Sequence, residues 1–311
     1  MRGRVLLAAS VLAAILVTAI TTVVLLLVEP TAAKAEAIKT GGLAGGAVIA
    51  LYALWLNDRR RRTEEARHEL ESEKVADERF ARSVELLGNE ADQVRVGALH
   101  ALAWLADSSP RYKQTVLDVL CAYLRRPFSH PSYTQRADDP EQATTDEAPD
   151  ADRERQVRLT AQRLITDLLP WGADTDPRAY HLDLTGASLE YFRLEGRRIG
   201  RLTARRTRFH GITQFGSVHA SKPALFSGAT FLGRVNMRDA QFEGGISFQH
   251  ATFCGEVAFS GASVGTFIDV KTTSPERHTG AITVAAGSRV AGDPATWPLA
   301  CLPPSPARAG A

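Results

Sequence analysis

The 311-residue chain has little with which to build a catalytic or metal centre. Its three cysteines, Cys121, Cys254 and Cys301, are widely separated and odd in number, so they predict neither a disulfide framework nor a zinc site. The eight histidines are scattered, and none pairs with a carboxylate at metal-binding spacing. The sequence has no Ser/His/Asp signature and no phosphate-binding loop. We therefore expect a non-enzymatic protein without cofactor or metal.

His250 and Cys254 flank Phe253 and are the candidates for a nucleophilic Cys/His pair. A catalytic thiol needs a base that a third group orients. No such group is evident in the sequence, so two isolated side chains are the favoured interpretation.

Long apolar runs are confined to the first sixty residues. Residues 5–28 contain no charged side chain and are long enough for a membrane-spanning helix. A second run, about residues 38–57, is rich in glycine at small-xxx-small spacing. Residues 1–62 therefore predict a transmembrane hairpin.

Arginines predict the orientation of this hairpin. Arg2 and Arg4 precede the first run, and residues 59–62 are four arginines that follow the second. Positive residues stay in the cytoplasm, so we expect an inner (plasma) membrane protein with two spans and both termini cytoplasmic. The alternative is a signal peptide cleaved near Ala33, although its apolar core would be unusually long.

Residues 63–172 predict a cytosolic helical segment. Apolar side chains recur at helical spacing around 80–87, 94–105, 112–123 and 164–168. Each helix is too short to be stable alone, so we expect a small helical bundle or an armadillo-like layer. Residues 127–153 are acidic and poor in apolar side chains, which predicts a disordered acidic loop.

From residue 180 the periodicity changes to about five. Leu184, Leu189, Leu194 and Ile199 are five residues apart, and phenylalanines recur at steps of five and six between 226 and 259. Neither a helix nor a plain strand has this period, so residues 180–270 predict a solenoid. The segments LTGASL at 184–189, FSGATF at 226–231, MRDAQF at 237–242 and FQHATF at 248–253 carry the pattern.

These segments resemble the pentapeptide-repeat family. The resemblance implies a right-handed quadrilateral β-helix in which each five-residue unit forms one side and the central Leu or Phe points inward. The whole layout of residues 1–270 is similar to actinobacterial membrane-anchored proteins with such repeats. The fold class that follows is membrane-anchored α+β, with two N-terminal transmembrane helices, a small helical bundle and the β-solenoid.

Three departures from the repeat pattern stand out. Steps average five and a half residues over 226–264, which predicts an extra residue at every second corner or a changed cross-section. Arg197 takes the place of a small inward residue, and residues 210–224 break the pattern and predict a loop. Residues 271–311 look like a disordered tail.

Arginines in the first repeats are the candidate interaction surface. They are Arg193, Arg198, Arg201, Arg205, Arg206 and Arg208, with Arg197 beside them. In a five-residue register, Arg193, Arg198 and Arg208 form one outward column, and Arg201 and Arg206 form another. Such columns suit phosphates, acidic lipids or an acidic protein segment, including the acidic loop at 137–154 of the same chain. The plainer alternative is a solvated face.

The leading hypothesis is a membrane-tethered scaffold that presents the solenoid to a protein partner in the cytosol. The expected partners are the lipid bilayer and an unknown protein, and the oligomeric state stays open. A nucleic-acid- or topoisomerase-binding regulator is the alternative. The net charge of +2 disfavours it, because neither sign of charge dominates. A sensor reading the outer loop is a third hypothesis, but that loop is very short.

Overall fold

The structure is a computed structural model that describes residues 12–13, 15–24, 27, 34–143, 148–172 and 176–301. The chain divides into two compact units, Met1–Asp77 and Glu78–Ala311.

The first unit is helical wherever it is described. Its main element is α2 (Lys34–Leu86), which continues into the second unit. Side chains of opposite charge lie one turn apart on its middle part, with Asp58 2.9 Å from Arg62 and Arg61 2.8 Å from Glu65. These are the (i, i+4) pairs that support an exposed helix.

The predicted transmembrane hairpin falls in this unit. Much of the first predicted span, 5–28, lies outside the described residues, and the second, 38–57, is part of α2. In the described part of the chain, no helix has both the length and the apolar character that crossing a membrane requires.

The second unit begins with the end of α2 and the predicted helical bundle. The bundle consists of α3 (Asp92–Ser108), η1 (Pro110–Tyr112), α4 (Lys113–Leu124) and α6 (Pro149–Leu168). Leu102 of α3, Leu120 of α4 and Ile165 of α6 are completely buried where these helices contact one another. Apolar side chains at helical spacing therefore form one shared core, as the sequence predicts.

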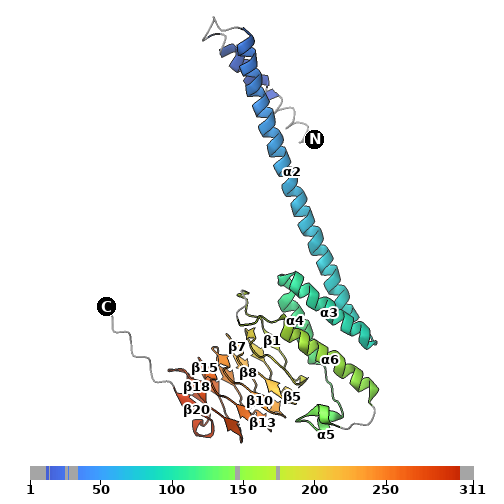
Figure 1. Ribbon diagram of the computed structural model, residues 1–311, viewed down its shortest axis with the longest axis vertical. Helices are drawn as coiled ribbons and strands as arrows, with labels where there is room; N and C mark the ends of the chain where they lie inside the picture. The colour runs from blue at the N-terminus through green and yellow to red at the C-terminus, as the bar shows by residue number, and fades with distance from the viewer. Residues whose placement is uncertain are drawn as a thin grey trace, which may run out of the picture. The chain divides into compact units, whose positions relative to one another are not determined.

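A right-handed β-solenoid of about five turns follows the bundle (Figure 1). Its four parallel sheets are named here after one of their strands. The β4 sheet contains β1 (Leu182–Asp183), β4 (Leu202–Thr203), β8 (Ala224–Leu225), β12 (Ile246–Ser247), β16 (Phe267–Asp269) and β19 (Arg289–Ala291). The β5 sheet contains β2 (Ser188–Glu190), β5 (Arg208–His210), β9 (Thr230–Phe231) and β13 (Thr252–Phe253). The β6 sheet contains β6 (Thr213–Gln214), β10 (Val235–Asn236), β14 (Val257–Ala258) and β17 (His278–Thr279). The β7 sheet contains β3 (Arg198–Ile199), β7 (His219–Ala220), β11 (Gln241–Phe242), β15 (Ser263–Val264), β18 (Ile282–Val284) and β20 (Leu299–Cys301).

The strand register explains the mixed five- and six-residue steps. Leu182 pairs with Leu202 and Leu202 pairs with Ala224, so a coil lengthens from 20 to 22 residues. Residues with positive φ, such as Gly228 and Asp239, lie at two opposite corners, where the chain takes six residues to reach the next strand. The extra residue therefore sits at every second corner, which is one of the two predicted solutions.

Stacked phenylalanines fill the solenoid. Phe209, Phe231 and Phe253 lie in successive strands of the β5 sheet, with ring centroids 4.6 and 5.0 Å apart and nearly parallel rings. Phe226 stacks on Phe248 at 5.5 Å. The inward position predicted for Phe226, Phe231, Phe248 and Phe253 is confirmed, because all four are buried, and Phe209 is buried with them. Each contributes about 1.5–3 kcal/mol through loss of contact with water.

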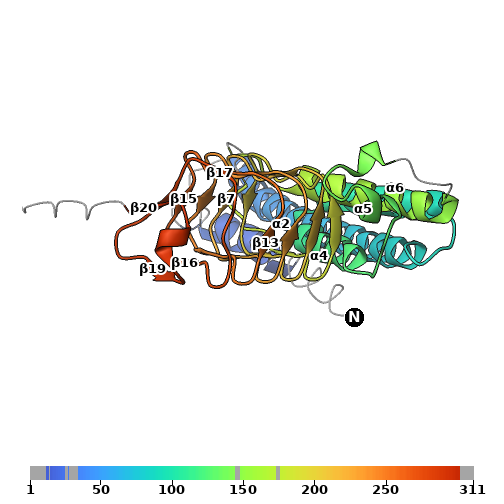
Figure 2. The same cartoon turned by 90° about the horizontal axis from the view of Figure 1, so that it is seen from below.

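The solenoid extends beyond the predicted boundary at residue 270. Residues 271–301 contain β17, β18, β19 and β20, which pair with the preceding coils. The prediction of a disordered tail is therefore wrong for these residues. Figure 2 shows β19 and β20 at the end of the solenoid opposite to α5 and α6. Residues 302–311 lie outside the described part of the chain.

Two segments predicted to be irregular have regular structure where the chain is described. Residues 210–224 continue the coil, with Thr213, Phe215 and Val218 buried, rather than forming a loop. The predicted acidic loop at 127–153 contains α5 (Ser132–Gln135), η2 (Pro140–Gln142) and the first turn of α6. Residues 127–143, here called the strap, lie along the solenoid, and Gly211 donates its backbone N–H to the carbonyl of Ala137.

Candidate functional site: a groove between helix α6 and the solenoid

The predicted interaction arginines do not form one surface. Arg193 is bridged to Gln214 of the β6 sheet, Arg198 lies in the β7 sheet and Arg208 lies in the β5 sheet. A step of five residues moves the chain to the next side of the solenoid, whereas stacking in one column requires 20 or 22 residues. The predicted column of these three arginines is therefore wrong.

The other predicted arginines flank a single strand. Arg201 precedes β4, and Arg205 and Arg206 follow it at the next corner. All three arginines are exposed. Arg198 is half-buried and donates to the carbonyl oxygen of Asp176 at 2.7 Å. The six arginines therefore face several directions.

Asp139 and Asp152 of the predicted acidic loop bind side chains other than these arginines. Among its described acids, Asp139 accepts a hydrogen bond from the hydroxyl of Tyr191 at 2.5 Å. Asp152 pairs with the buried imidazole of His130 at 2.8 Å. These contacts fix the strap and the start of α6.

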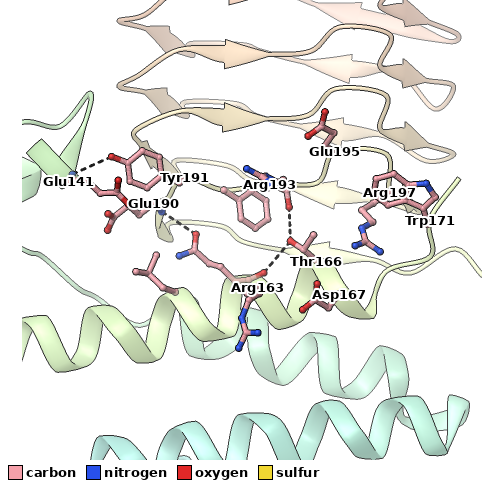
Figure 3. A pocket seen from close by; sticks show the side chains of 13 residues that line it. Glu141, Arg163, Thr166, Asp167, Trp171, Glu190, Tyr191, Arg193, Glu195 and Arg197 are labelled. Atoms are coloured by element: carbon pink, nitrogen blue, oxygen red, sulfur yellow. Dashed lines mark hydrogen bonds between the residues drawn. The ribbon is translucent and has the colours of Figure 1, made fainter.

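A groove of about 650 Å³ lies between α6 and the first coil of the solenoid (Figure 3). Its helix side carries Leu159, Gln162, Arg163, Thr166 and Asp167. Its solenoid side carries Glu190, Tyr191, Phe192, Arg193, Glu195 and Arg197, and Glu141 and Trp171 complete the lining. The hydroxyl of Thr166 donates to the carbonyl of Arg193 at 2.6 Å, which ties the two sides together.

Trp171 forms one end of the groove. Its side chain is 50% exposed, and the guanidinium of Arg197 lies 4.9 Å from the centre of the ring. Arg197 also donates to the carbonyl of Leu169 at 2.9 Å, so it holds the chain that leaves α6 instead of pointing into the solenoid. A Cβ on Gly196 would lie only 2.8 Å from the Trp171 ring, so the indole packs closely on backbone.

Six charged side chains that line the groove have no ion-pair partner among the described residues: Glu141, Arg163, Asp167, Arg193, Glu195 and Arg197. Figure 3 shows Arg163 and Asp167 on α6, and Arg193 and Glu195 on the facing coil. Both signs of charge are thus present on both sides. Of the predicted interaction residues, the groove contains Arg193. Its other members include residues of α6 and the turn at Trp171, which no repeat pattern marks.

A buried ion pair forms the floor of the groove. The Glu190 side chain is almost completely buried, and Arg155 of α6 donates two hydrogen bonds to its carboxylate, one of them at 2.8 Å. Tyr133 of α5 donates to the same carboxylate at 3.1 Å. The hydrogen bond to Glu190 raises the pKa of Arg155, and burial raises the pKa of Tyr133. This network joins bundle, strap and solenoid.

His250 and Cys254 lie on either side of β13, at opposite ends of one side of the coil. Cys121 is buried, which raises the pKa of its thiol to about 12 and makes it a poor nucleophile. In the described part of the chain, no group of three His, Cys, Asp or Glu side chains is placed to hold a metal ion.

The repeat pattern agrees with a known family. The family model described as "Pentapeptide repeats (9 copies)" matches residues 204–252 and 226–265. No curated protein matches the chain, and no solved structure matches it. The matched residues include strands β5 to β15, where the inward phenylalanines stack. Residues 204–265 of this chain therefore belong to the pentapeptide-repeat family, as the sequence analysis predicts.

Proposed function

We propose that this protein is a non-enzymatic scaffold at the inner membrane, and that the groove between α6 and the solenoid binds a segment of a partner protein. The pentapeptide-repeat solenoid is a fold of the protein-interaction type. The bundle and the strap are joined to it through the buried Glu190 network, which gives the groove rigid walls.

The observation that carries this proposal is the combination of a half-exposed tryptophan with unpaired charges in one groove. Trp171 offers a large ring surface, and aromatic side chains with arginines are the residue types that dominate protein–protein binding. Arg163 and Arg193 can each form a charge-assisted hydrogen bond, and Asp167 and Glu195 can accept one.

The groove suits an extended segment that carries both signs of charge. Its solenoid wall is the outermost chain of the β6 sheet, because Arg193 bridges to Gln214 on one side only. The carbonyl of Arg193 already accepts a hydrogen bond from Thr166 on the other side, so the partner segment would be bound mainly by the side chains of the groove. A partner aromatic or apolar side chain would pack on Trp171.

Charge reversal in the groove should abolish binding of the partner. In the double variant Arg163→Glu/Arg193→Glu, we expect the yield of cross-linked product to fall at least about tenfold. The reason is that each lost charge-assisted hydrogen bond costs about 1.5–3 kcal/mol of binding free energy. The measurement is photo-cross-linking in cells with p-benzoylphenylalanine at Leu159, which lines the groove and leaves Trp171 in place.

The matched control is Arg201→Glu/Arg205→Glu, which changes the net charge equally at exposed positions outside the groove. Cross-linking should be unchanged in this control. A product that survives reversal of Arg163 and Arg193, or that disappears equally in the control, contradicts the proposed groove.

The membrane tether is a separate part of the proposal and rests on the sequence. The uncharged run at 5–28 and the arginines at 59–62 favour two spans with both termini in the cytoplasm. We expect the full-length chain to stay with membranes after an alkaline carbonate wash, and a variant without residues 1–57 to be released. Recovery of the full-length chain entirely in the soluble fraction would contradict the tether.

A further inference from the structure

A second cavity, of about 290 Å³, lies between the strap and the β5 sheet. Its sheet side is formed by Ser188, Arg208 and Thr230, which pair in register and so share one outward face. Its strap side includes Phe128, Ser129, Tyr133 and Thr134, and His210 and Leu232 complete it. Arg208 is the one member of the predicted arginine surface that lines this cavity.

His210 is the unusual residue of this cavity. It is only 3% exposed, yet neither ring nitrogen has a hydrogen-bond partner among the described residues. The imidazole ring of His210 stacks on the ring of Tyr133 with centroids 3.8 Å apart. Tyr133 of the strap thus covers one face of the imidazole, and the ring nitrogens remain for hydrogen bonds to a ligand. A buried polar atom without a partner costs about 1–3 kcal/mol, which favours a ligand that hydrogen-bonds to it.

The remaining polar groups of the cavity are mainly donors. The guanidinium of Arg208 makes no ion pair in the described part of the chain, and Ser129, Ser188 and Thr230 bring hydroxyls without a protein partner there. The hydroxyl of Thr134 already donates to the carbonyl of Pro131 at 2.8 Å. No carboxylate lines the cavity. The nearby Glu190 is neutralised by Arg155.

We propose that this cavity binds a phosphate group, either as inorganic phosphate or as a small phosphomonoester. A guanidinium donates hydrogen bonds to phosphate oxygens in matching geometry, and hydroxyls complete the coordination of the remaining oxygens. The neutral imidazole of His210 donates one N–H from either tautomer. The absence of carboxylates from the lining means that a doubly charged anion meets no repulsion within the site.

Binding is measured by isothermal titration calorimetry on the full-length chain, with inorganic phosphate and with phosphoserine as separate ligands at constant ionic strength. We expect saturable binding of at least one ligand. Arg208→Gln should weaken it at least tenfold, because it removes the cation, and His210→Phe should weaken it while keeping the ring that stacks on Tyr133. Arg205→Gln is the matched control, since it removes an exposed arginine three residues away that does not line the cavity.

Each outcome bears directly on the proposal. Binding of phosphate that Arg208→Gln weakens and Arg205→Gln leaves unchanged supports a site for the free ion, and the same pattern with phosphoserine alone supports a phosphomonoester site. Absence of saturable binding of both ligands overturns the proposal. So does binding that Arg208→Gln leaves intact or that Arg205→Gln weakens equally. Urea unfolding of each variant shows that lost binding does not come from an unfolded chain.

Discussion

Replacing Trp297 by alanine should lower the free energy of unfolding of the second unit by about 3–5 kcal/mol, the range measured for large aromatic side chains removed from a core. Trp297 is only 4% exposed. Its ring stacks on Phe248 at 5.2 Å and also contacts Phe253 and Phe259, at 5.9 and 5.8 Å. The loss is large because this one ring closes the phenylalanine core at its C-terminal end.

Trp297 is also held by its polar edge. The indole N–H donates to the carbonyl of Thr273 at 2.8 Å, so alanine leaves that carbonyl without its partner as well. The measurement is urea unfolding followed by circular dichroism. Trp104→Ala is the matched control, because the Trp104 side chain is 57% exposed and its main contact is the guanidinium of Arg79, 5.4 Å from the ring. That substitution should cost at most about 1 kcal/mol. Equal losses in the two variants would mean that Trp297 does not close the core.

Trp297 illustrates what the periodicity of the sequence can and cannot reveal. The repeat is recognisable at 184–199, at steps of five, and between 226 and 264, where each coil takes 22 residues and the steps alternate between five and six. In the last coils, Ser263 pairs with Thr283 after 20 residues, and the corners are built differently. Ile282, Val284 and Trp297 still point inward, but at irregular spacing. The five-residue pattern is lost in these coils because the lengths of the corners change while the sheets continue.

The placement of the arginines was missed for a related reason. The five-residue period correctly predicts which side chains point inward, as the burial of Leu189 and Phe231 shows. It does not give the length of a complete coil, and that length decides which outward side chains are neighbours. Arg193 and Arg208 consequently line two different cavities.

The order of the strap comes from hydrogen bonds between residues far apart in the sequence, which local composition cannot predict. The segment has few apolar side chains, so local composition predicts disorder. Tyr133 instead bonds to Glu190, and Asp139 bonds to Tyr191, across more than fifty residues. A sequence contains no local signal for such contacts. The two candidate sites both lie beside these contacts, which is why neither was predicted as a site.

Replacing Glu190 by alanine should destabilise the second unit by about 3–5 kcal/mol, because removing one member of a buried ion pair leaves the other charge unpaired. Arg155 would lose both hydrogen bonds to the carboxylate, and Tyr133 would lose the acceptor of its hydroxyl. Urea unfolding measures the total loss. Limited proteolysis should show earlier cleavage in the strap, because Tyr133 is one of its anchors on the solenoid.

A surface pair of the same kind separates the effect of burial from the effect of charge. Arg125 and Asp183 also form an ion pair between bundle and solenoid, but their side chains are 38% and 49% exposed. Asp183→Ala should therefore cost at most about 1 kcal/mol. The double variant Arg155→Met/Glu190→Leu should recover much of the stability lost in Glu190→Ala, because apolar side chains of similar volume leave no buried charge. If Asp183→Ala lowers the free energy of unfolding as much as Glu190→Ala does, burial is not what makes the Arg155–Glu190 pair important for stability. If the double variant is as unstable as the single one, the hydrogen-bond geometry around Glu190 is required, and packing alone cannot hold the strap, the bundle and the solenoid together.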